Sequence, residues 1–253
     1  MSSLALYPAQ LILHPQVTQS LKVLSTTVGR DKLYRLIQYF ARIVAWYLLR
    51  QGDKEGAIRW TGLKGGLTVG RKLMRVFKPV EHLQLAIKAT QAPPANLSSS
   101  AGKAAEIERI AQVARQVAYA GYLTTDSVVY LQGIKFLNLN PDKFARTSKV
   151  SQRFWLAGIL LSLISSAAGV VKVRKEAKRA SLTVDNEKGD GARSKALVAQ
   201  RSALFTQIVQ DSLDAFIPAS NLGLVELQDG TVGAIGVITS WMALTALWAK
   251  ARV

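Results

Sequence analysis

The residues from 154 to 171 form a run of 18 residues without a charge, and this run limits most strongly what the chain can fold into. Arg153 precedes it, and Lys172, Arg174 and Lys175 follow it closely. As an α-helix the run reaches about 27 Å, close to the thickness of the hydrocarbon core of a bilayer. The basic residues at both ends suit the phosphate layers on either side. We therefore predict a membrane span here.

A second uncharged run extends from residue 230 to residue 249, between Asp229 and Lys250. Either run alone could be the buried helix of a large soluble core, but a soluble domain seldom needs two such helices. The sequence therefore predicts an integral membrane protein with at least two transmembrane helices.

The chain is also strongly basic, with 33 Lys and Arg residues against 16 Asp and Glu residues and a net charge of +17. A soluble nucleic-acid-binding protein could carry this charge, but it would not usually carry two uncharged runs as well. We therefore expect no nucleic-acid partner. Anionic membrane lipids are the partner that the charge favours.

The charge is unevenly distributed along the chain. Residues 1–153 hold 22 basic and 8 acidic residues, whereas residues 172–229 hold 9 and 8. Because cations tend to stay on the cytosolic side, this bias predicts that protease in the cytosol reaches residues 1–150 and the tail after residue 249. Residues 180–225 are expected to be shielded. The cations between Lys172 and Arg179 argue the other way, because they directly follow the first run.

The rest of the chain has the periodicity and the break points of helices, with no strand alternation. We predict an N-terminal helical region over residues 1–91, a Pro- and Ser-containing linker over residues 92–102, and a membrane-embedded helical region over residues 103–253. The N-terminal region should contain helices at about 15–28, 31–50 and 56–90, the last with a kink at Pro79. The expected fold class is all-α, with amphipathic helices on the cytosolic side.

Residues 116–134 hold one ionisable residue, Asp126, and two interpretations are open. The stretch could be a third intramembrane helix whose carboxylate faces a partner or a watery cavity. Its other polar residues favour instead a cytosolic or interfacial helix with Asp126 in water. These residues are Thr124, Thr125, Ser127 and Gln132.

The helix predicted around residues 63–83 separates cations from apolar residues. At 100° per residue, one side collects the cations that we predict to bind lipid phosphates, namely Lys64, Arg71, Lys72, Arg75 and Lys78. The opposite arc includes the residues that we predict to insert among the lipids, namely Leu73, Met74, Phe77 and Val80. Insertion expands one leaflet and favours curvature. The alternative is an ordinary helix whose apolar face packs on its neighbours while the cations are solvated.

Two pairs of small residues stand four positions apart within the predicted spans, Gly236 with Ser240 and Ser165 with Gly169. Small residues let helix backbones approach closely in lipid, so these pairs are candidate contacts for a homo-oligomer. Ordinary lipid-facing small residues are the alternative interpretation.

Enzyme chemistry finds no support in the sequence. His14 and His82 are far apart and lack a neighbouring acid cluster, and Asp211 and Asp214 are expected to form a solvated helix face. We expect no catalytic residue, metal or cofactor. A pore for small metabolites is the alternative function, and it would need polar residues lining a helix bundle. The candidates for that lining are Asp126, Ser162, Ser165, Ser166, Thr239 and Ser240.

Four stretches, in the same order along almost the whole chain, resemble the peroxisomal membrane proliferation factors, the peroxin-eleven proteins. They are Gly-Arg-Asp-Lys-Leu-Tyr-Arg-Leu-Ile-Gln-Tyr-Phe at residues 29–40, Gly-Arg-Lys-Leu-Met-Arg-Val-Phe-Lys at residues 70–78, Trp-Leu at residues 155–156, and the segment from Gly230 through Ser240. The resemblance implies an all-helical peroxisomal membrane protein with both termini in the cytosol. It also implies an amphipathic helix that tubulates the membrane before division, self-association, and recruitment of fission machinery that includes a dynamin-type GTPase.

Overall fold

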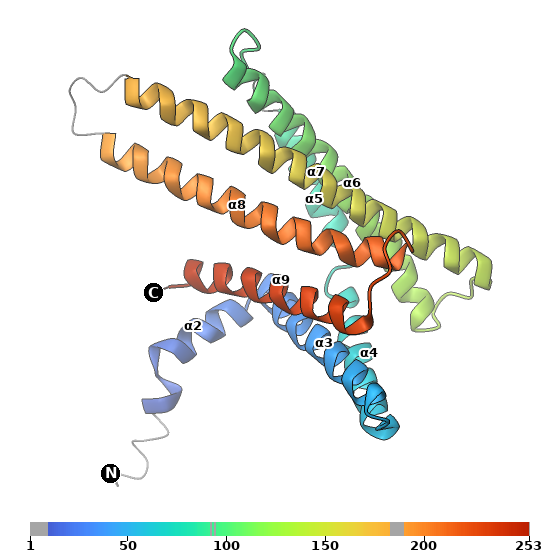
Figure 1. Ribbon diagram of the computed structural model, residues 1–253. Coiled ribbons are helices and arrows are strands. Elements are labelled where there is room, and N and C mark those ends of the chain that lie inside the picture. Colours follow the sequence, from blue (N-terminus) through green and yellow to red (C-terminus); the bar gives the residue numbers. More distant parts are fainter. Residues whose placement is uncertain (1–9, 92, 94, 183–189, 253) are drawn as a thin grey trace. The chain divides into compact units, whose positions relative to one another are not determined.

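A computed structural model describes residues 10–91, 93, 95–182 and 190–252, and this part of the chain is helical with no strand. The main helices, in order, are α2 (Pro15–Leu24), α3 (Thr27–Arg50), α4 (Lys54–Leu73), α5 (Lys78–Thr90), α6 (Ser100–Gly133), α7 (Pro141–Leu182), α8 (Asp190–Asn221) and α9 (Asp229–Lys250) (Figure 1). The predicted all-α fold class is confirmed.

Contacts divide the chain into two compact units. The first unit comprises Met1–Met74 and Leu227–Val253, and in it α3 packs against both α4 and α9. The second comprises Arg75–Glu226, where α5 packs on α6, α6 on α7 and α7 on α8. The division does not fall at the linker expected over residues 92–102, because the helices on either side of that segment pack on each other.

The N-terminal helices begin where side chains cap them. The Thr26 hydroxyl accepts a hydrogen bond from the Gly29 amide at 2.9 Å, and Asp53 accepts one from the Gly56 amide at 2.8 Å. Such caps satisfy amide groups that have no partner inside the helix. The helix expected to reach residue 28 therefore ends earlier, at Leu24, and Gly29 lies inside α3. A side chain there would collide with the Val23 carbonyl group.

The single helix predicted over residues 56–90 is two helices. α4 ends at Leu73, residues 74–77 form a turn, and α5 begins at Lys78. Pro79 lies in the first turn of α5, where its missing amide hydrogen costs no intrahelical bond. Proline thus starts a new helix instead of kinking an existing one.

Among the residues that the structure describes, two helices are long and apolar enough to cross a membrane, as predicted. One is the segment Pro141–Arg179 of α7, which contains the first uncharged run, and the other is α9. Glycines let α9 approach α3 within the first unit. A β-carbon on Gly233 would lie 2.6 Å from Ile43 Cγ1, one on Gly230 would lie 2.6 Å from the Trp46 ring, and one on Gly236 would overlap the Tyr39 ring.

This packing predicts opposite effects for two Gly→Ala substitutions. Gly236→Ala should destabilise the packing of α9 on α3 by about 1–3 kcal/mol, the usual cost of overpacking. Gly62→Ala in α4, where a β-carbon meets nothing within 4 Å, should stabilise the protein by about 0.5–1 kcal/mol through helix propensity. Thermal unfolding in detergent measures both. Equal midpoints for the two variants would contradict the close approach.

Candidate membrane-binding site

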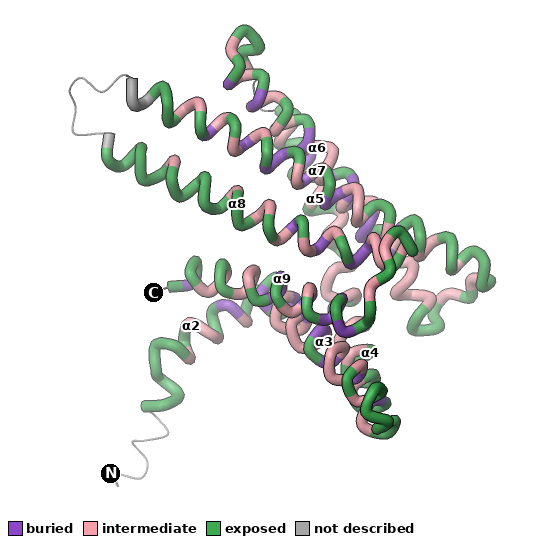
Figure 2. Tube along the Cα trace, in the orientation of Figure 1, coloured by how far each residue is buried: buried purple, intermediate pink, exposed green. Residues whose placement is uncertain are grey.

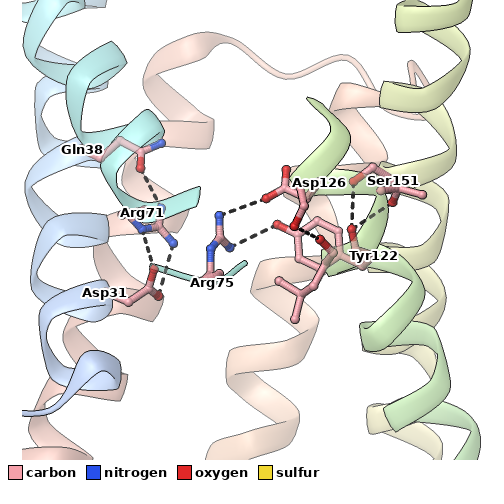
Figure 3. Close-up of polar contacts among 10 residues, drawn as sticks. Asp31, Gln38, Arg71, Arg75, Tyr122, Asp126 and Ser151 are labelled. Atoms are coloured by element: carbon pink, nitrogen blue, oxygen red, sulfur yellow. Dashed lines mark hydrogen bonds and ion pairs between the residues drawn. The ribbon is translucent and has the colours of Figure 1, made fainter. Parts of the chain in front are cut away.

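Arg71, from the cationic side of the predicted amphipathic helix, lies inside the first unit. Its Nε donates to Asp31 Oδ1 at 3.1 Å, and its Nη1 donates to Gln38 Oε1 at 2.7 Å (Figure 3). Arg71 and Asp31 are both buried, and Asp31 and Gln38 belong to α3. In this structure Arg71 therefore joins α4 to α3, where the sequence predicted a contact with lipid.

Arg75 lies inside the second unit in a similar way. Its Nη2 is 3.3 Å from Asp126 Oδ2, and its Nη1 donates to the Tyr122 hydroxyl at 3.3 Å (Figure 3). Tyr122 in turn stacks on Trp155 with ring centroids 5.5 Å apart. Asp126 is only 5% exposed, so the expectation that this carboxylate lies in water is wrong. Its solvation is replaced by the guanidinium group, which the sequence could not place near it.

The remaining cations of the predicted face are half-buried lysines, Lys64, Lys72 and Lys78. The Lys78 ammonium pairs with Glu81 at 3.2 Å across an exposed turn of α5. Exposed pairs of this kind contribute about 0–1 kcal/mol and are easily exchanged for another anion. The predicted cationic face therefore divides into two arginines, Arg71 buried and Arg75 half-buried, that pair with buried carboxylates, and three half-buried lysines.

The apolar residues predicted to insert are mostly turned outward. Phe77 in the turn is 83% exposed, Leu73 at the end of α4 is 58% exposed, and Val80 in α5 is 56% exposed, while Met74 is half-buried. The alternative interpretation, an apolar face packed on neighbouring helices, requires these side chains to be buried. The described residues show the opposite of this alternative, in which the cations are solvated: Arg71 and Arg75 point into the protein, and the apolar side chains point outward.

The second unit also has a polar interior that the sequence did not reveal. Asp211 and Asp214 are buried, and Asp211 accepts hydrogen bonds from the Ser162 hydroxyl at 2.5 Å and from Gln207 at 2.8 Å. The expected solvated face is therefore wrong for both carboxylates. The missed signal is the spacing of Phe205, Val209 and Phe216, which places apolar residues on the side of α8 opposite to the two acids.

A cavity of about 630 Å³ lies beside this interior, between α6, α7 and α8. Ser165 and Ser166 line it, together with two ion pairs, Arg109 with Glu106 and Lys172 with Glu108, and with Arg115. Lys172 contacts Glu108 at 2.8 Å, and hydrogen bonds from Arg109 hold the pKa of Glu106 below its ordinary value. Two of the serines named as pore candidates thus face a polar space.

The four candidate oligomerisation residues have contacts within the chain. Gly236 faces α3 as described, and the Ser240 hydroxyl donates to the Gly236 carbonyl group. The Ser165 hydroxyl donates to the Glu108 carbonyl group at 3.4 Å, and a β-carbon on Gly169 would lie 3.2 Å from Leu204. These contacts explain the small residues without a second copy. Oligomerisation through them stays a prediction.

The two histidines have local structural roles. His82 Nδ1 lies 2.6 Å from Gln116 Oε1, and its ring packs on Tyr119. His14 accepts a hydrogen bond from the Gln16 amide at the start of α2. Among the residues that the structure describes, no group of three or more His, Asp or Glu side chains is placed to hold a metal ion.

Together, the helical fold, the two helices that are long and apolar enough to cross a bilayer and the outward-facing apolar residues are typical of an all-helical membrane protein. The chain belongs to the peroxisomal biogenesis factor 11 (PEX11) family, whose model matches residues 17–248. The resemblance inferred from the four sequence stretches is therefore confirmed.

Similar proteins cover nearly the whole chain. Peroxisomal membrane protein PMP27 of Saccharomyces cerevisiae is 28% identical in an alignment 244 residues long that covers 94% of this chain and 97% of that protein. Peroxisomal biogenesis factor 11 of Schizosaccharomyces pombe is 25% identical, covering 93% of this chain and 96% of that protein. Peroxisomal membrane protein 11A of Mus musculus is 23% identical, covering 88% and 93%. No solved structure matches the chain.

Proposed function

We propose that this protein acts in the peroxisomal membrane, where it elongates and tubulates the bilayer and so promotes organelle fission and proliferation. The family and the names of the relatives support the organelle and the process. One structural observation supports the mechanism: Leu73, Phe77 and Val80 are exposed although they are apolar. Residues 1–153 are then expected on the cytosolic side, following the charge bias.

The mechanism is a shallow wedge held by the folded protein. Phe77 and its apolar neighbours enter the headgroup and upper acyl region of the cytosolic leaflet, while nearby lysines attract anionic phosphates. Arg71 and Arg75 contribute differently, because each ties one flank of the 74–77 turn to its own unit. A wedge fixed to a folded body loses less conformational entropy on insertion than a free peptide does.

The proposal is tested in cells by expressing the full chain and measuring the length and number of peroxisomes by light microscopy. We expect longer peroxisomes first and more numerous ones later. Unchanged length and number, with the chain present in the peroxisomal membrane, would contradict the proposal.

The lysines provide a test of the electrostatic part. The double variant Lys64→Ala with Lys78→Ala is compared with the wild type while both are embedded in nanodiscs and bind separate anionic vesicles. The variant should bind the vesicles more weakly by about 2 kcal/mol at low salt, because each cation contributes about 1 kcal/mol. The loss should shrink at high salt, where screening already removes most of the attraction. Recruitment of anionic vesicles to nanodisc-embedded protein measures this, with Lys22→Ala as a control on α2. Because the control removes one cation instead of two, a loss half as large for the control would mean that only net charge matters.

A pore for small metabolites is the second candidate, and the polar interior of the second unit favours it. Ser162 and Asp211 are buried together, and the neighbouring cavity is lined by charged and hydroxyl side chains. Thr239 and Ser240 lend it less support, because both hydroxyl groups donate to the Gly236 carbonyl group of their own helix. Solute flux through liposomes that contain the protein distinguishes this function from remodelling alone.

Self-association and recruitment of a dynamin-type GTPase complete the proposal. The wedge can expand one leaflet locally, but a tube needs many copies acting together, and severing it needs mechanical work from a nucleotide-driven enzyme. Crosslinking in the membrane tests the first partner, and co-reconstitution with a purified dynamin-type GTPase tests the second.

A further inference from the structure

We propose that α8 is a further membrane-embedded helix, which returns across the bilayer beside α7 and presents one face to lipid acyl chains. The charge bias of the sequence instead predicted that residues 180–225, between the two spans, are shielded on the far side of the membrane. α8 lacks the uniform hydropathy of a span because it contains Asp211 and Asp214. Both acids, however, are buried within the second unit.

The first argument is the depth at which α8 lies relative to the uncharged run of α7. Near one end of the pair, Asn221 Nδ2 donates to Gln152 Oε1 at 3.0 Å, and in the middle the Ser162 hydroxyl donates to Asp211 at 2.5 Å. Near the other end, a β-carbon on Gly169 would lie 3.2 Å from the Leu204 side chain. These contacts align residues 204–221 antiparallel with residues 152–169, and the two helices lie side by side (Figure 1). If residues 154–171 cross the bilayer, residues 204–221 lie at the same depth.

The second argument is the distribution of polarity around α8. One side of α8 carries Gln207, Asp211, Asp214 and Pro218. The last three of these residues are buried. Phe205, Val209 and Phe216 share the other side and are 45%, 50% and 45% exposed. Figure 2 shows exposed positions along much of α8. A helix surrounded by lipid turns its polar side chains toward the interior of the protein and its apolar side chains toward the acyl chains. α8 has this distribution.

The third argument is length and charge. Between Arg201 and the end of α8 at Asn221 the only ionisable residues are the two buried acids. Residues 202–221 extend over about 30 Å as a helix, which matches the hydrocarbon core. The outward face of this segment therefore carries no charge over the full thickness of a bilayer.

The hydrogen bond between Ser162 and Asp211 also lies at a place where a membrane protein can accommodate a carboxylate. Ser162 stands near the middle of the uncharged run of α7, and Asp211 stands near the middle of residues 202–221. Donors from Ser162 and Gln207 reach Asp211 from inside the unit, so the carboxylate does not face hydrocarbon. Intramembrane acids in this position face the interior of their bundle.

The proposal changes the expected topology. The C-terminal end of α7 and the N-terminal end of α8 lie on one face of the membrane, and residues 222–228 lie on the other, the same face as Arg153. Residues 180–225 then do not form one segment that is shielded from protease in the cytosol, because they cross the membrane. Because α9 starts from that second face, a crossing by α9 would place the tail after Lys250 opposite to Arg153, against the expectations from charge and from the resemblance; both termini share one face if α9 does not cross.

Spin labels on single cysteines test the proposal, because the chain contains no native cysteine. The full chain is reconstituted in liposomes with one label at Phe205, Val209, Ser212 or Phe216, and collision with oxygen is compared with collision with a water-soluble nickel chelate. Labels at Leu160 and Ile164 of α7 are the lipid-facing reference, and a label at Arg193 is the aqueous reference. Helicity measured by circular dichroism confirms that each variant is folded.

We expect oxygen to dominate at all four α8 positions, with the greatest depth at Val209 and Ser212 and the aqueous pattern at Arg193. Dominance of the nickel chelate at Val209 would show a water-exposed helix and overturn the proposal. Low access to both reagents would show that protein covers the face, from this chain or a second copy, and would also overturn it. An aqueous pattern at Leu160 would remove the premise that α7 spans the bilayer, with the same consequence.

Discussion

Phe77→Glu is expected to abolish peroxisome elongation while leaving the protein folded and in the membrane. Phe77 is 83% exposed, so a charge at this position disrupts no packing, but it prevents the side chain from entering the acyl region. The measurement is peroxisome length in cells that express the variant at wild-type abundance. We expect the length to fall to that of cells without the protein.

Leu97→Glu is the matched control, because Leu97 is also an exposed apolar residue outside a helix, at 57% exposure. Its variant should elongate peroxisomes as the wild type does. If Phe77→Glu lowered the abundance of the protein, Phe77 would be a packing residue. If it left both abundance and elongation unchanged, the wedge mechanism would be lost.

Arg75→Met is expected to destabilise the second unit strongly, by about 3–5 kcal/mol, because it leaves the Asp126 carboxylate buried without its guanidinium partner. Lys78→Met, three residues further on, breaks an exposed pair and should cost about 0–1 kcal/mol. Denaturant unfolding in detergent, followed by circular dichroism, measures both. The sequence alone assigned these two cations the same role.

The double variant Arg75→Met with Asp126→Leu separates the ion pair from other effects of the substitution. Replacing both charges by apolar groups should recover most of the lost stability, because no unpaired charge remains buried. A result in which Arg75→Met costs no more than Lys78→Met but weakens vesicle binding would identify Arg75 as a lipid contact after all.

The sequence predicted the helical class and the two apolar helices because both depend on local composition. A charge-free run such as residues 154–171 can be recognised as a candidate span from its own composition, without knowing which helices pack against it. The amphipathic pattern around Phe77 was visible for the same reason. What the pattern could not decide was which side of the helix faces the protein, since Arg71 and Asp31 are far apart in the chain and meet only in the fold.

The buried acids mark the limit of reasoning from hydropathy. Asp211 and Asp214 were expected on a solvated helix face, and the polar residues near Asp126 favoured water over the other open interpretation, an intramembrane helix. Their partners, such as Arg75 and Ser162, come from distant parts of the chain, so the cost of burying a carboxylate is offset only after tertiary packing. Pro79 indicated a break near residues 74–77, but the sequence pattern alone did not show that these residues form a turn between two helices.

Electron cryo-microscopy of liposomes carrying the purified full-length protein tests membrane remodelling most directly. At a fixed protein-to-lipid ratio, we predict narrow tubules from anionic vesicles, far fewer from vesicles of neutral lipid, and none from anionic vesicles carrying Phe77→Glu. Spherical anionic vesicles in the presence of correctly inserted wild-type protein would contradict the account.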